Sequence, residues 1–338
     1  MRAAWYENRG RAREVLRVGE METPVPGPGE VRIRVEFSGI NTGDVKKRQV
    51  WLGAGAMAHP RIVPHNDGAG VVDAAGEGVP RSWLGRRVWC SYAQSYRPYG
   101  TAAQYTVVPV RHVGALPQEV PAEQGACLGI PGLTAHRAVF ADGPVAGTTV
   151  LVAGAAGSVG RAASALARRG GARVIGTVTR ADQLDAVREG GADHALRTGP
   201  HLAAAVLELT GGRGADRVIE VALDANVHAD ADLLAPGGAV VTYATGDPEP
   251  ALPFWPLAFK NATVRLLGYD DFPPKAVAAG IAEVTAAAAA GDLRYPIAGV
   301  FPLTDIAAAH EAVERPQKPG RVLLALPDGR QAGQELSA

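Results

Sequence analysis

The sequence has few cysteines, no long apolar run and no apolar amino-terminal segment. Only Cys90 and Cys127 occur in 338 residues, and two thiols can build neither a disulfide framework nor a four-thiolate zinc site. No run reaches the ~18 apolar residues that span a bilayer, and the amino terminus lacks the apolar core of a secretory signal. These absences predict a cytoplasmic protein in a reducing compartment, with no membrane partner.

An excess of charge of either sign is also missing, because 34 Lys and Arg residues balance 34 Asp and Glu residues. A neutral chain lacks the basic footprint of nucleic-acid binding, so we expect no nucleic-acid partner. Apolar residues, by contrast, make up 47% of the sequence. That share, in a chain longer than one core usually spans, predicts two domains, each with its own core.

The pattern of apolar residues changes near residue 121. Before that point, residues 31–35 alternate apolar and charged side chains as a half-buried strand does, and other short apolar runs are separated by glycine and proline turns. This spacing predicts a barrel-like β domain. After it, helical patterns alternate with apolar strands at residues 149–153, 173–177, 217–221, 239–243 and 263–267. Such alternation predicts an α/β fold, with a parallel sheet covered by helices on both faces.

A glycine-rich segment follows the first of these later strands and opens a helix. It runs from Gly154 to Gly160 and reads Gly-Ala-Ala-Gly-Ser-Val-Gly. A nucleotide pyrophosphate needs close approach to the backbone and gains from the positive end of a helix. The strand–turn–helix context therefore predicts a dinucleotide site, whereas the alternative is a glycine turn that binds no nucleotide.

The end of the next strand bears on the choice of cofactor. An NAD site usually places an acidic residue ~20 positions after the glycines, to bind the ribose hydroxyls. Here Thr179 and Arg180 stand at that place without an acid. An arginine beside a hydroxyl suits the 2′-phosphate of NADPH, although Arg180 could also be a solvated loop residue. Asp182, slightly further on, is expected to cap a helix.

Six further segments agree in order and spacing with one family. They are residues 38–44, 64–72, 128–135, 235–238, 310–312 and 320–324. The first two read Ser-Gly-Ile-Asn-Thr-Gly-Asp and Pro-His-Asn-Asp-Gly-Ala-Gly-Val-Val. Over nearly its full length the chain resembles the zinc-free quinone oxidoreductases, the zeta-crystallin-like branch of the medium-chain dehydrogenases/reductases.

The resemblance implies an N-terminal GroES-like β domain plus a doubly wound Rossmann domain. The first would comprise residues 1–123 and 272–338, and the second residues 124–271. NADPH is implied to lie in the cleft between them, and a homodimer is implied to form through the edge of the Rossmann sheet.

The same resemblance bears on metal binding. Zinc-dependent relatives carry a Cys where Asn41 stands and a His where Asn66 stands. Neutral amides are poor zinc ligands compared with thiolate and imidazole, so we expect no metal.

Site residues follow from the resemblance position by position. Asn41 is implied to face the nicotinamide and Thr134 to touch its ribose or amide. Asp44 completes the candidate catalytic set, although it also suits a helix N-cap. The implied cofactor contacts are Gly154, Ala156, Gly157, Ser158, Val159, Gly160, Thr179, Arg180, Arg197, Tyr243, Ala244, Thr245, Gly268 and Tyr269.

The family's substrate-facing tyrosine is replaced here by Lys46, which argues against a simple quinone specificity. The candidate substrate contacts are Trp51, Asn66 and Tyr92. The two aromatic residues offer an alternative aromatic face, whereas Asn66 suits a buried hydrogen-bonding role equally well.

A site without metal has no Lewis acid to polarise an alcohol or ketone. The predicted substrate is therefore already electron-poor, such as a quinone or an α,β-unsaturated carbonyl that accepts hydride from NADPH. Asn41 is expected to supply a dipole near the developing oxyanion, unless it merely caps a turn. Two other functions stay open: reduction of an enoyl thioester, and NADPH binding with little catalysis.

Overall fold

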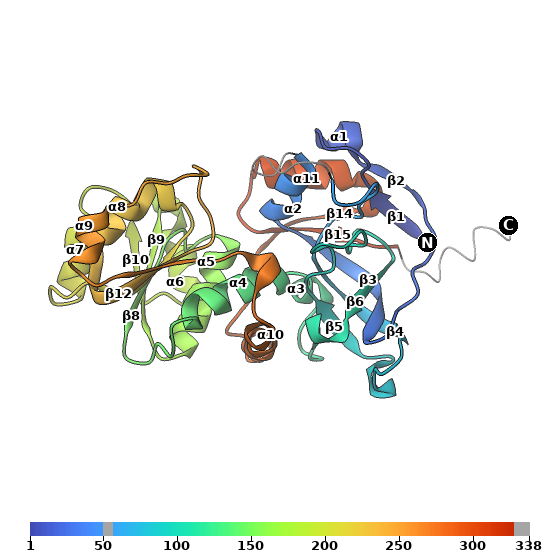
Figure 1. Cartoon of the computed structure of the whole chain (residues 1–338), viewed down its shortest axis with the longest axis horizontal. Coiled ribbons are helices and arrows are strands. Elements are labelled where there is room, and N and C mark those ends of the chain that lie inside the picture. Colours follow the sequence, from blue (N-terminus) through green and yellow to red (C-terminus); the bar gives the residue numbers. More distant parts are fainter. Residues whose placement is uncertain (50–56, 328–338) are drawn as a thin grey trace. The chain divides into compact units, whose positions relative to one another are not determined.

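The computed structural model describes residues 1–49 and 57–327 of the chain. They form two units, shown in Figure 1, and each unit is described by itself. The first unit contains Met1–Ile130 together with the chain from Tyr295 onwards, and the second contains Pro131–Arg294. None of the described helices is both long and apolar enough to cross a membrane.

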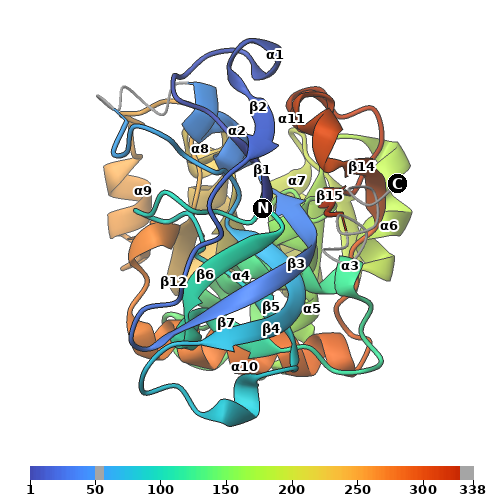
Figure 2. The same cartoon turned by 90° about the vertical axis from the view of Figure 1, so that its right-hand side faces the viewer.

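The first unit is built on a mostly antiparallel sheet around strand β3, Glu30–Ile40. Alternation places Val31, Ile33 and Val35 in the core, at most 2% exposed, as the sequence predicted. β3 pairs with β15, β4 and β6, and Figure 2 looks onto these strands. The order β14-β15-β3-β4-β5-β7 uses Ile297–Pro302, Arg321–Ala325, β3, Asp67–Ala75, Arg87–Cys90 and Val113–Ala115, with β6 at Tyr105–Pro109.

Short elements complete the first unit. A separate antiparallel pair consists of β1, Arg2–Trp5, and β2, Arg17–Glu20. The helices are α1 at Ala12–Val15, α2 at Thr42–Gln49, α3 at Ala122–Gly125 and α11 at Ile306–Glu314. Helix α11 packs on α1, α2 and β15. The chain that returns after the second unit therefore completes the core of the first.

The second unit has a six-stranded parallel sheet in the order β10-β9-β8-β11-β12-β13. Its strands are β8 Thr149–Val152, β9 Arg173–Val178, β10 His194–Arg197, β11 Ala215–Glu220, β12 Leu234–Thr242 and β13 Thr263–Leu266. The order reverses between β8 and β11, which is the strand order of a Rossmann sheet. Dinucleotides bind such sheets outside the carboxyl ends of the strands, at the point of reversal.

Seven helices accompany this sheet in the described residues, several of them labelled around it in Figure 1. Helix α5 shows why they pack there, since its apolar face of Ala162, Ala163 and Leu166 is buried. The helices are α4 Gly129–Phe140, α5 Ser158–Arg169, α6 Leu184–Glu189, α7 Leu202–Leu209, α8 Leu223–Leu233, α9 Phe254–Ala258 and α10 Pro274–Ala289.

The unit boundaries differ from the expected domain boundaries at residues 123 and 272. The second unit ends instead at Arg294, because α10 docks on α5. Arg169 of α5 holds this segment through ion pairs to Glu283 at 2.7 Å and Asp292 at 2.6 Å. Both partners lie more than 100 residues from Arg169 in the chain, so no local sequence pattern predicts that α10 packs on α5.

Candidate functional site

The glycine segment forms a tight loop between β8 and α5. Gly154 has φ +62°, a left-handed conformation that favours glycine. A Cβ at Gly160 would lie 2.3 Å from the Gly154 carbonyl oxygen, so only glycine allows this approach. Helix α5 begins after Gly157, and no side chain of the described residues caps it. Its first backbone N–H groups are therefore available to an anion.

Two arginines lie where the neighbouring strands end. Thr179 and Arg180 directly follow β9, and Arg197 is the last residue of β10. The parallel register pairs Arg197 with Val178, so Arg197 stands beside the end of β9. Both guanidinium groups are exposed to solvent. This arrangement suits a charged phosphate near the end of β9.

The expectation that Asp182 caps a helix is wrong. Asp182 lies inside the 3-10 turn Ala181–Gln183, and no side chain caps that turn. Its carboxylate instead accepts hydrogen bonds from Arg180, one of them from Nε at 3.0 Å. An ion pair as exposed as this one contributes little to stability, because water and salt screen it. A phosphate can therefore displace Asp182 from Arg180 at small cost.

The remaining expected cofactor residues follow β12 and β13. Tyr243, Ala244 and Thr245 come directly after β12, and the Thr245 hydroxyl donates to Asp224 Oδ1 at 3.2 Å. Gly268 lies two residues beyond β13, and Tyr269 follows it. Carboxyl ends of parallel strands meet at one edge of a sheet. All the expected cofactor residues of the second unit's strands and loops therefore gather at this edge, which we call the carboxyl edge.

Thr134 lies on α4, apart from the strand ends in sequence. Its side chain is 4% exposed, and its Oγ1 has no hydrogen-bond partner among the described residues. A buried hydroxyl without a partner costs ~1–3 kcal/mol. A bound group that exchanges a hydrogen bond with this hydroxyl removes that cost, which fits the expected contact with the cofactor.

The first unit holds a buried polar cluster, defined as Asn41, Asp44, Asn66, Asp67 and Ser91. Asp67 is its centre and is fully buried. Its carboxylate accepts hydrogen bonds from Asn41 Nδ2 at 2.8 Å and from the Ser91 hydroxyl at 3.2 Å. It also accepts the backbone N–H of Ile130 at 2.9 Å. The cluster thus joins the ends of β3 and β5 to the start of β4.

Asn41 and Asp44 also shape the start of helix α2. The Asn41 carbonyl accepts the N–H of Asp44 at 3.0 Å, and Asp44 Oδ2 accepts the Asn41 N–H at 2.8 Å. This is the return half of a capping box. The sequence left Asp44 open between a catalytic role and a helix N-cap. Asp44 is instead the third residue of α2, and Asn41 occupies the N-cap position. The Asn41 side chain remains directed at Asp67.

Asn66 is held at both ends of its amide. Its Oδ1 accepts from the Gln94 N–H at 3.2 Å and from the Ser95 hydroxyl at 3.0 Å, while Nδ2 donates to Asp44 at 3.2 Å. Only 1% of the residue is exposed. Between the two roles that the sequence left open, the structure favours the buried hydrogen-bonding role over contact with substrate.

Burial controls the protonation of the cluster. Desolvation raises the pKa of Asp67 to about 7, and the Asp44 carboxylate adds to this, while Arg321 opposes it. Arg321 Nη2 lies 3.8 Å from Asp67 Oδ2. Desolvation also raises the pKa of Asp44, against the N–H group that Asn41 donates to it. The sequence marked neither Asp67 nor Arg321 as a site residue, and the two lie more than 250 residues apart in the chain.

The candidate substrate residues have different surroundings. Trp51 lies outside the described residues. Tyr92 is buried, has φ +60° and packs its ring 4.7 Å from that of His112. Tyr96, with φ +54°, is 68% exposed. It offers the exposed aromatic side chain that we expected from Trp51 or Tyr92. No sequence signal separates these tyrosines, because both lie in one loop rich in turn residues.

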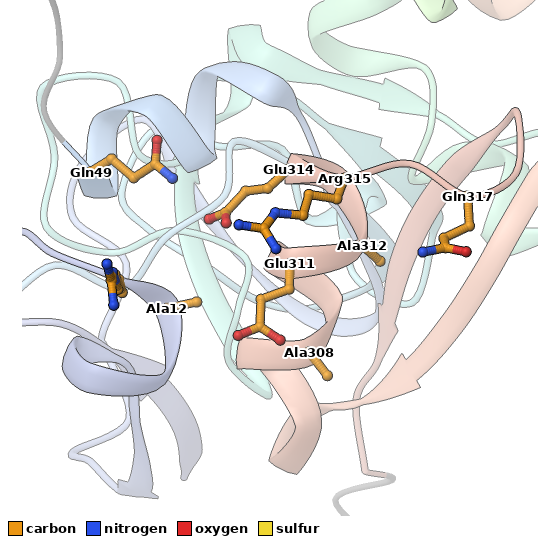
Figure 3. A pocket seen from close by; sticks show the side chains of 9 residues that line it. Ala12, Gln49, Ala308, Glu311, Ala312, Glu314, Arg315 and Gln317 are labelled. Atoms are coloured by element: carbon orange, nitrogen blue, oxygen red, sulfur yellow. The ribbon is translucent and has the colours of Figure 1, made fainter.

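The first unit also contains an open cavity of about 700 Å³ beside α2 and α11, shown in Figure 3. None of the expected catalytic or cofactor residues lines it. Its walls are formed by Arg11, Ala12, Gln49, Ala308, Glu311, Ala312, Glu314, Arg315 and Gln317. The described ranges contain no group of three His, Cys, Asp or Glu residues arranged to hold a metal.

Comparison with known proteins gives the two units their family. Residues 27–118 match the alcohol dehydrogenase GroES-like domain, and residues 158–285 match the model described as zinc-binding dehydrogenase. The quinone oxidoreductase of Rattus norvegicus is 31% identical over 239 residues, which cover 68% of each chain. The chain belongs to the quinone oxidoreductase family of the medium-chain dehydrogenases/reductases. The expected GroES-like and Rossmann folds are confirmed.

The chain is also similar to a reductase with another substrate in its name and to a solved NADPH complex. A 2-haloacrylate reductase of a Burkholderia species is 29% identical, with the match covering 92% of this chain and 93% of the relative. The solved structure of mycobacterial Rv1454c complexed with NADPH superposes with a TM-score of 0.82 at 27% identity. That match covers 96% of this chain and 99% of the other.

Proposed function

We propose that this protein is an NADPH-dependent oxidoreductase that transfers hydride to a quinone or an α,β-unsaturated carbonyl without zinc. The observation that carries the proposal is the carboxyl edge, where an uncapped helix start and two exposed arginines stand at adjacent strand ends. The family supports it, since named relatives include quinone oxidoreductases and a 2-haloacrylate reductase.

NADPH supplies the hydride, and the residues of the second unit fit its parts. Ser158 and Val159 offer backbone N–H groups to the pyrophosphate, while the Gly157 N–H is donated to the Gly154 carbonyl and closes the loop. Thr179, Arg180 and Arg197 bind the 2′-phosphate. The buried Thr134 hydroxyl gains the partner that it lacks among the described side chains. Tyr243 to Thr245, with Gly268 and Tyr269, border the nicotinamide end at the carboxyl edge.

Asn41 is the residue that acts on the substrate. Its amide nitrogen carries two hydrogens, one of which is donated to Asp67. That bond fixes which end of the amide carries the nitrogen. The Asn41 amide also hydrogen-bonds to the Asp44 carboxylate. Its second hydrogen turns to the acceptor oxygen as negative charge develops there, which lowers the barrier most when the donor is already oriented.

The donor set supports zinc independence. Positions 41 and 66 carry neutral amides, whose oxygens are weaker zinc ligands than thiolate or imidazole, and both amide nitrogens donate to carboxylates. The test is NADPH oxidation by protein treated with a chelator, with zinc measured in the same sample. Full activity at less than about 0.1 zinc per chain supports the proposal. Activity that disappears and returns with stoichiometric zinc contradicts it.

The acceptor class is tested by a matched set of substrates. NADPH and NADH are compared with 9,10-phenanthrenequinone, a simple enone and an enoyl-CoA thioester, following absorbance at 340 nm. The proposal predicts turnover with the quinone or the enone, and faster with NADPH than with NADH. Turnover of the thioester alone would make the protein an enoyl-thioester reductase. Tight NADPH binding without turnover of any acceptor would indicate an NADPH-binding protein with little catalysis.

A homodimer through the second unit is part of the proposal. Among the described strands, β13 pairs only with β12, so its other edge is open. Next to it in sequence, α9 and its end expose Phe254, Trp255 and Phe259 by 63–80%, and Leu266 of β13 is 72% exposed. Exposed apolar surface of this kind beside an open strand edge is typical of a protein interface.

A further inference from the structure

A chain of buried hydrogen bonds runs through the first unit, beginning at Arg48 of α2. Arg48 Nε donates to His310 Nδ1 at 3.3 Å. The other ring nitrogen of His310 lies 2.9 Å from Nε2 of His65. All three side chains are fully buried. His310 belongs to α11 and His65 precedes β4, so the chain joins segments 245 residues apart.

From His65 the chain continues to the polar cluster. His65 Nδ1 lies 2.9 Å from the Ser38 hydroxyl, which lies 2.7 Å from the Thr101 hydroxyl. The Thr101 hydroxyl donates to the main-chain carbonyl of Asp67 at 2.7 Å. The carboxylate of the same Asp67 accepts the amide of Asn41.

The chemistry of the two ends fixes the direction of every bond between them. Arg48 can only donate, so His310 Nδ1 accepts and its Nε2 carries the proton. His310 then donates to His65 Nε2, and His65 Nδ1–H donates to Ser38. Ser38 in turn donates to Thr101, whose own hydrogen points to Asp67, because a carbonyl can only accept.

Burial keeps both imidazoles in the neutral forms that this direction requires. Desolvation, together with the nearby charge of Arg321, lowers the pKa of His65 to about 3. Desolvation lowers the pKa of His310 as well, with His65 and Arg48 acting in the same direction. Near neutral pH each ring therefore has one donor and one acceptor, and each is used.

The outer end of the chain is anchored at the cavity. Arg48 donates to Glu314 and to the Gly10 carbonyl. Glu314 is one of the cavity's lining residues and is labelled in Figure 3. The inner end is the backbone of the residue that orients Asn41. The chain therefore ties α11 to the polar cluster.

We propose that His310 is a positioning residue, which acts through His65, Ser38 and Thr101 to fix the Asp67 backbone and so the orientation of Asn41. The inference rests on the proposed function, because it assigns His310 an effect on hydride transfer. His310 itself contacts no reacting atom. A buried network that only supports folding would lower stability in every variant but would leave the turnover of the folded enzyme unchanged.

Thr101→Val breaks the chain with the smallest change in shape, because it replaces only the hydroxyl. Misplacement of a reacting group by about 1 Å can cost about 100-fold in rate, so a partial shift predicts a kcat about tenfold lower. The KM for NADPH stays unchanged, since the carboxyl edge belongs to the other unit. Thr101→Ser retains the hydroxyl and restores kcat.

Thr106→Val is the matched control, because Thr106 is equally buried in the same unit and donates only to the Tyr99 carbonyl. If Thr106→Val lowers kcat as much as Thr101→Val does, the chain has no special role. Equal kcat for Thr101→Val and the parent enzyme overturns the proposal directly.

The protonation and tautomers of His65 and His310 can be measured without an activity assay. In protein labelled with ¹⁵N-histidine, the proposal predicts at pH 7 a neutral His310 with its proton on Nε2 and a neutral His65 with its proton on Nδ1. The opposite tautomer at either ring overturns the proposed direction. His310→Gln, which can accept and donate in the same order, should keep kcat within about threefold, whereas His310→Leu should lower it.

These readings separate the two proposals. If no acceptor is turned over, the proposed function fails, and the tautomers still decide whether the chain exists as described. If turnover is normal but the Thr101 and His310 variants behave like the Thr106 control, only the positioning role fails.

Discussion

Asn41 is the residue whose replacement should affect turnover most directly. Asn41→Leu keeps a side chain of similar size but removes the amide that lies between Asp67 and the acceptor. Loss of one oriented donor to a developing oxyanion typically costs about 100–1000-fold in kcat. We expect a loss of about 100-fold with an unchanged dissociation constant for NADPH. Weakened NADPH binding with normal kcat would place Asn41 in a different role.

A second residue-scale prediction concerns a buried acid pair in the second unit. Glu220 Oε1 accepts the N–H groups of Val221 and Ala222 and the amide of Asn226. Its Oε2 and Asp230 Oδ2 find no N–H or hydroxyl donor in the described part of the chain. One proton held between these carboxyl groups satisfies both oxygens, which assigns the proton to Asp230.

Desolvation and the charge of Glu220 raise the pKa of Asp230 to about 8. Because this folded-state pKa lies above the ordinary value of 3.8, the stabilising contribution of the protonated Asp230 is complete only below pH 3.8 and is lost progressively as the pH rises from there to about 8. Asp230→Asn donates its amide hydrogen to Glu220 at every pH. It should raise Tm by about 5 °C at pH 9 and by clearly less at pH 5.

Scanning calorimetry from pH 5 to pH 9 measures this difference. Asp232→Asn, an exposed neighbour on the same helix, is the control and should leave the pH profile unchanged. Parallel profiles for the Asp230 variant and the parent protein would show that Asp230 is already ionised at pH 5.

At the scale of elements, the ends of β9 and β10 decide cofactor choice. Arg180 is held by Asp182, and the pair must open to admit a 2′-phosphate. Asp182→Asn removes the competing charge, so it should tighten NADPH binding about twofold to fivefold and leave NADH binding unchanged. Arg180→Glu should weaken NADPH far more than NADH. Fluorescence titration of both cofactors measures these constants.

Asp185→Asn provides the matched control for that experiment. Asp185 forms a comparable exposed pair with Arg188 on α6, at 2.7 Å, but follows the turn that contains Asp182. The two substitutions remove the same charge a few residues apart. Equal tightening of NADPH by both variants would indicate a general charge effect rather than release of Arg180.

Elements with a strong local pattern were predictable, and those defined by distant partners were not. The sequence predicts β3 by its alternating apolar residues, and it predicts the strands around the glycine loop by apolar runs between turns. β10 has only four residues, none fully buried, and was not predicted. β14 is half exposed and ends in proline, and α11 gains its burial from α1 and α2. β14 and α11 take their places only when the chain returns to the first unit and packs against it.

The candidate site shows the same division. The glycine loop and the lack of an acid in residues 177–180 are local features, so the sequence alone suggests a nucleotide site at the carboxyl edge. The ion pair that engages Arg180 was misread, because a short turn looks like a helix start. His65, Ser38, Thr101 and His310 carry no shared motif, since their relation arises from strand pairing and from the docking of α11.

At the scale of the whole molecule, the proposed dimer makes a prediction about mass. Phe259 is 80% exposed at the end of α9, four residues before β13 begins. The parent protein should have twice the chain mass of 35.0 kDa, and Phe259→Asp should shift it toward the monomer. Light scattering after size exclusion gives the mass. Val25→Asp, an equally exposed apolar position in the first unit, should leave it unchanged.

A parent protein of 35.0 kDa in solution would remove the dimer from the proposal. A Phe259→Asp variant that stays dimeric would instead move the interface away from α9 and β13. Neither outcome alters the assignment of the carboxyl edge, whose residues all belong to one chain.

Calorimetric titration of NADPH, with NADH in parallel, most directly tests whether the carboxyl edge holds the cofactor. Charge-assisted hydrogen bonds to a phosphate contribute ~1.5–3 kcal/mol, so we expect one NADPH per chain, bound at least about tenfold more tightly than NADH. Failure to bind either dinucleotide, or tighter binding of NADH, would contradict the proposed cofactor and the role given to Arg180 and Arg197.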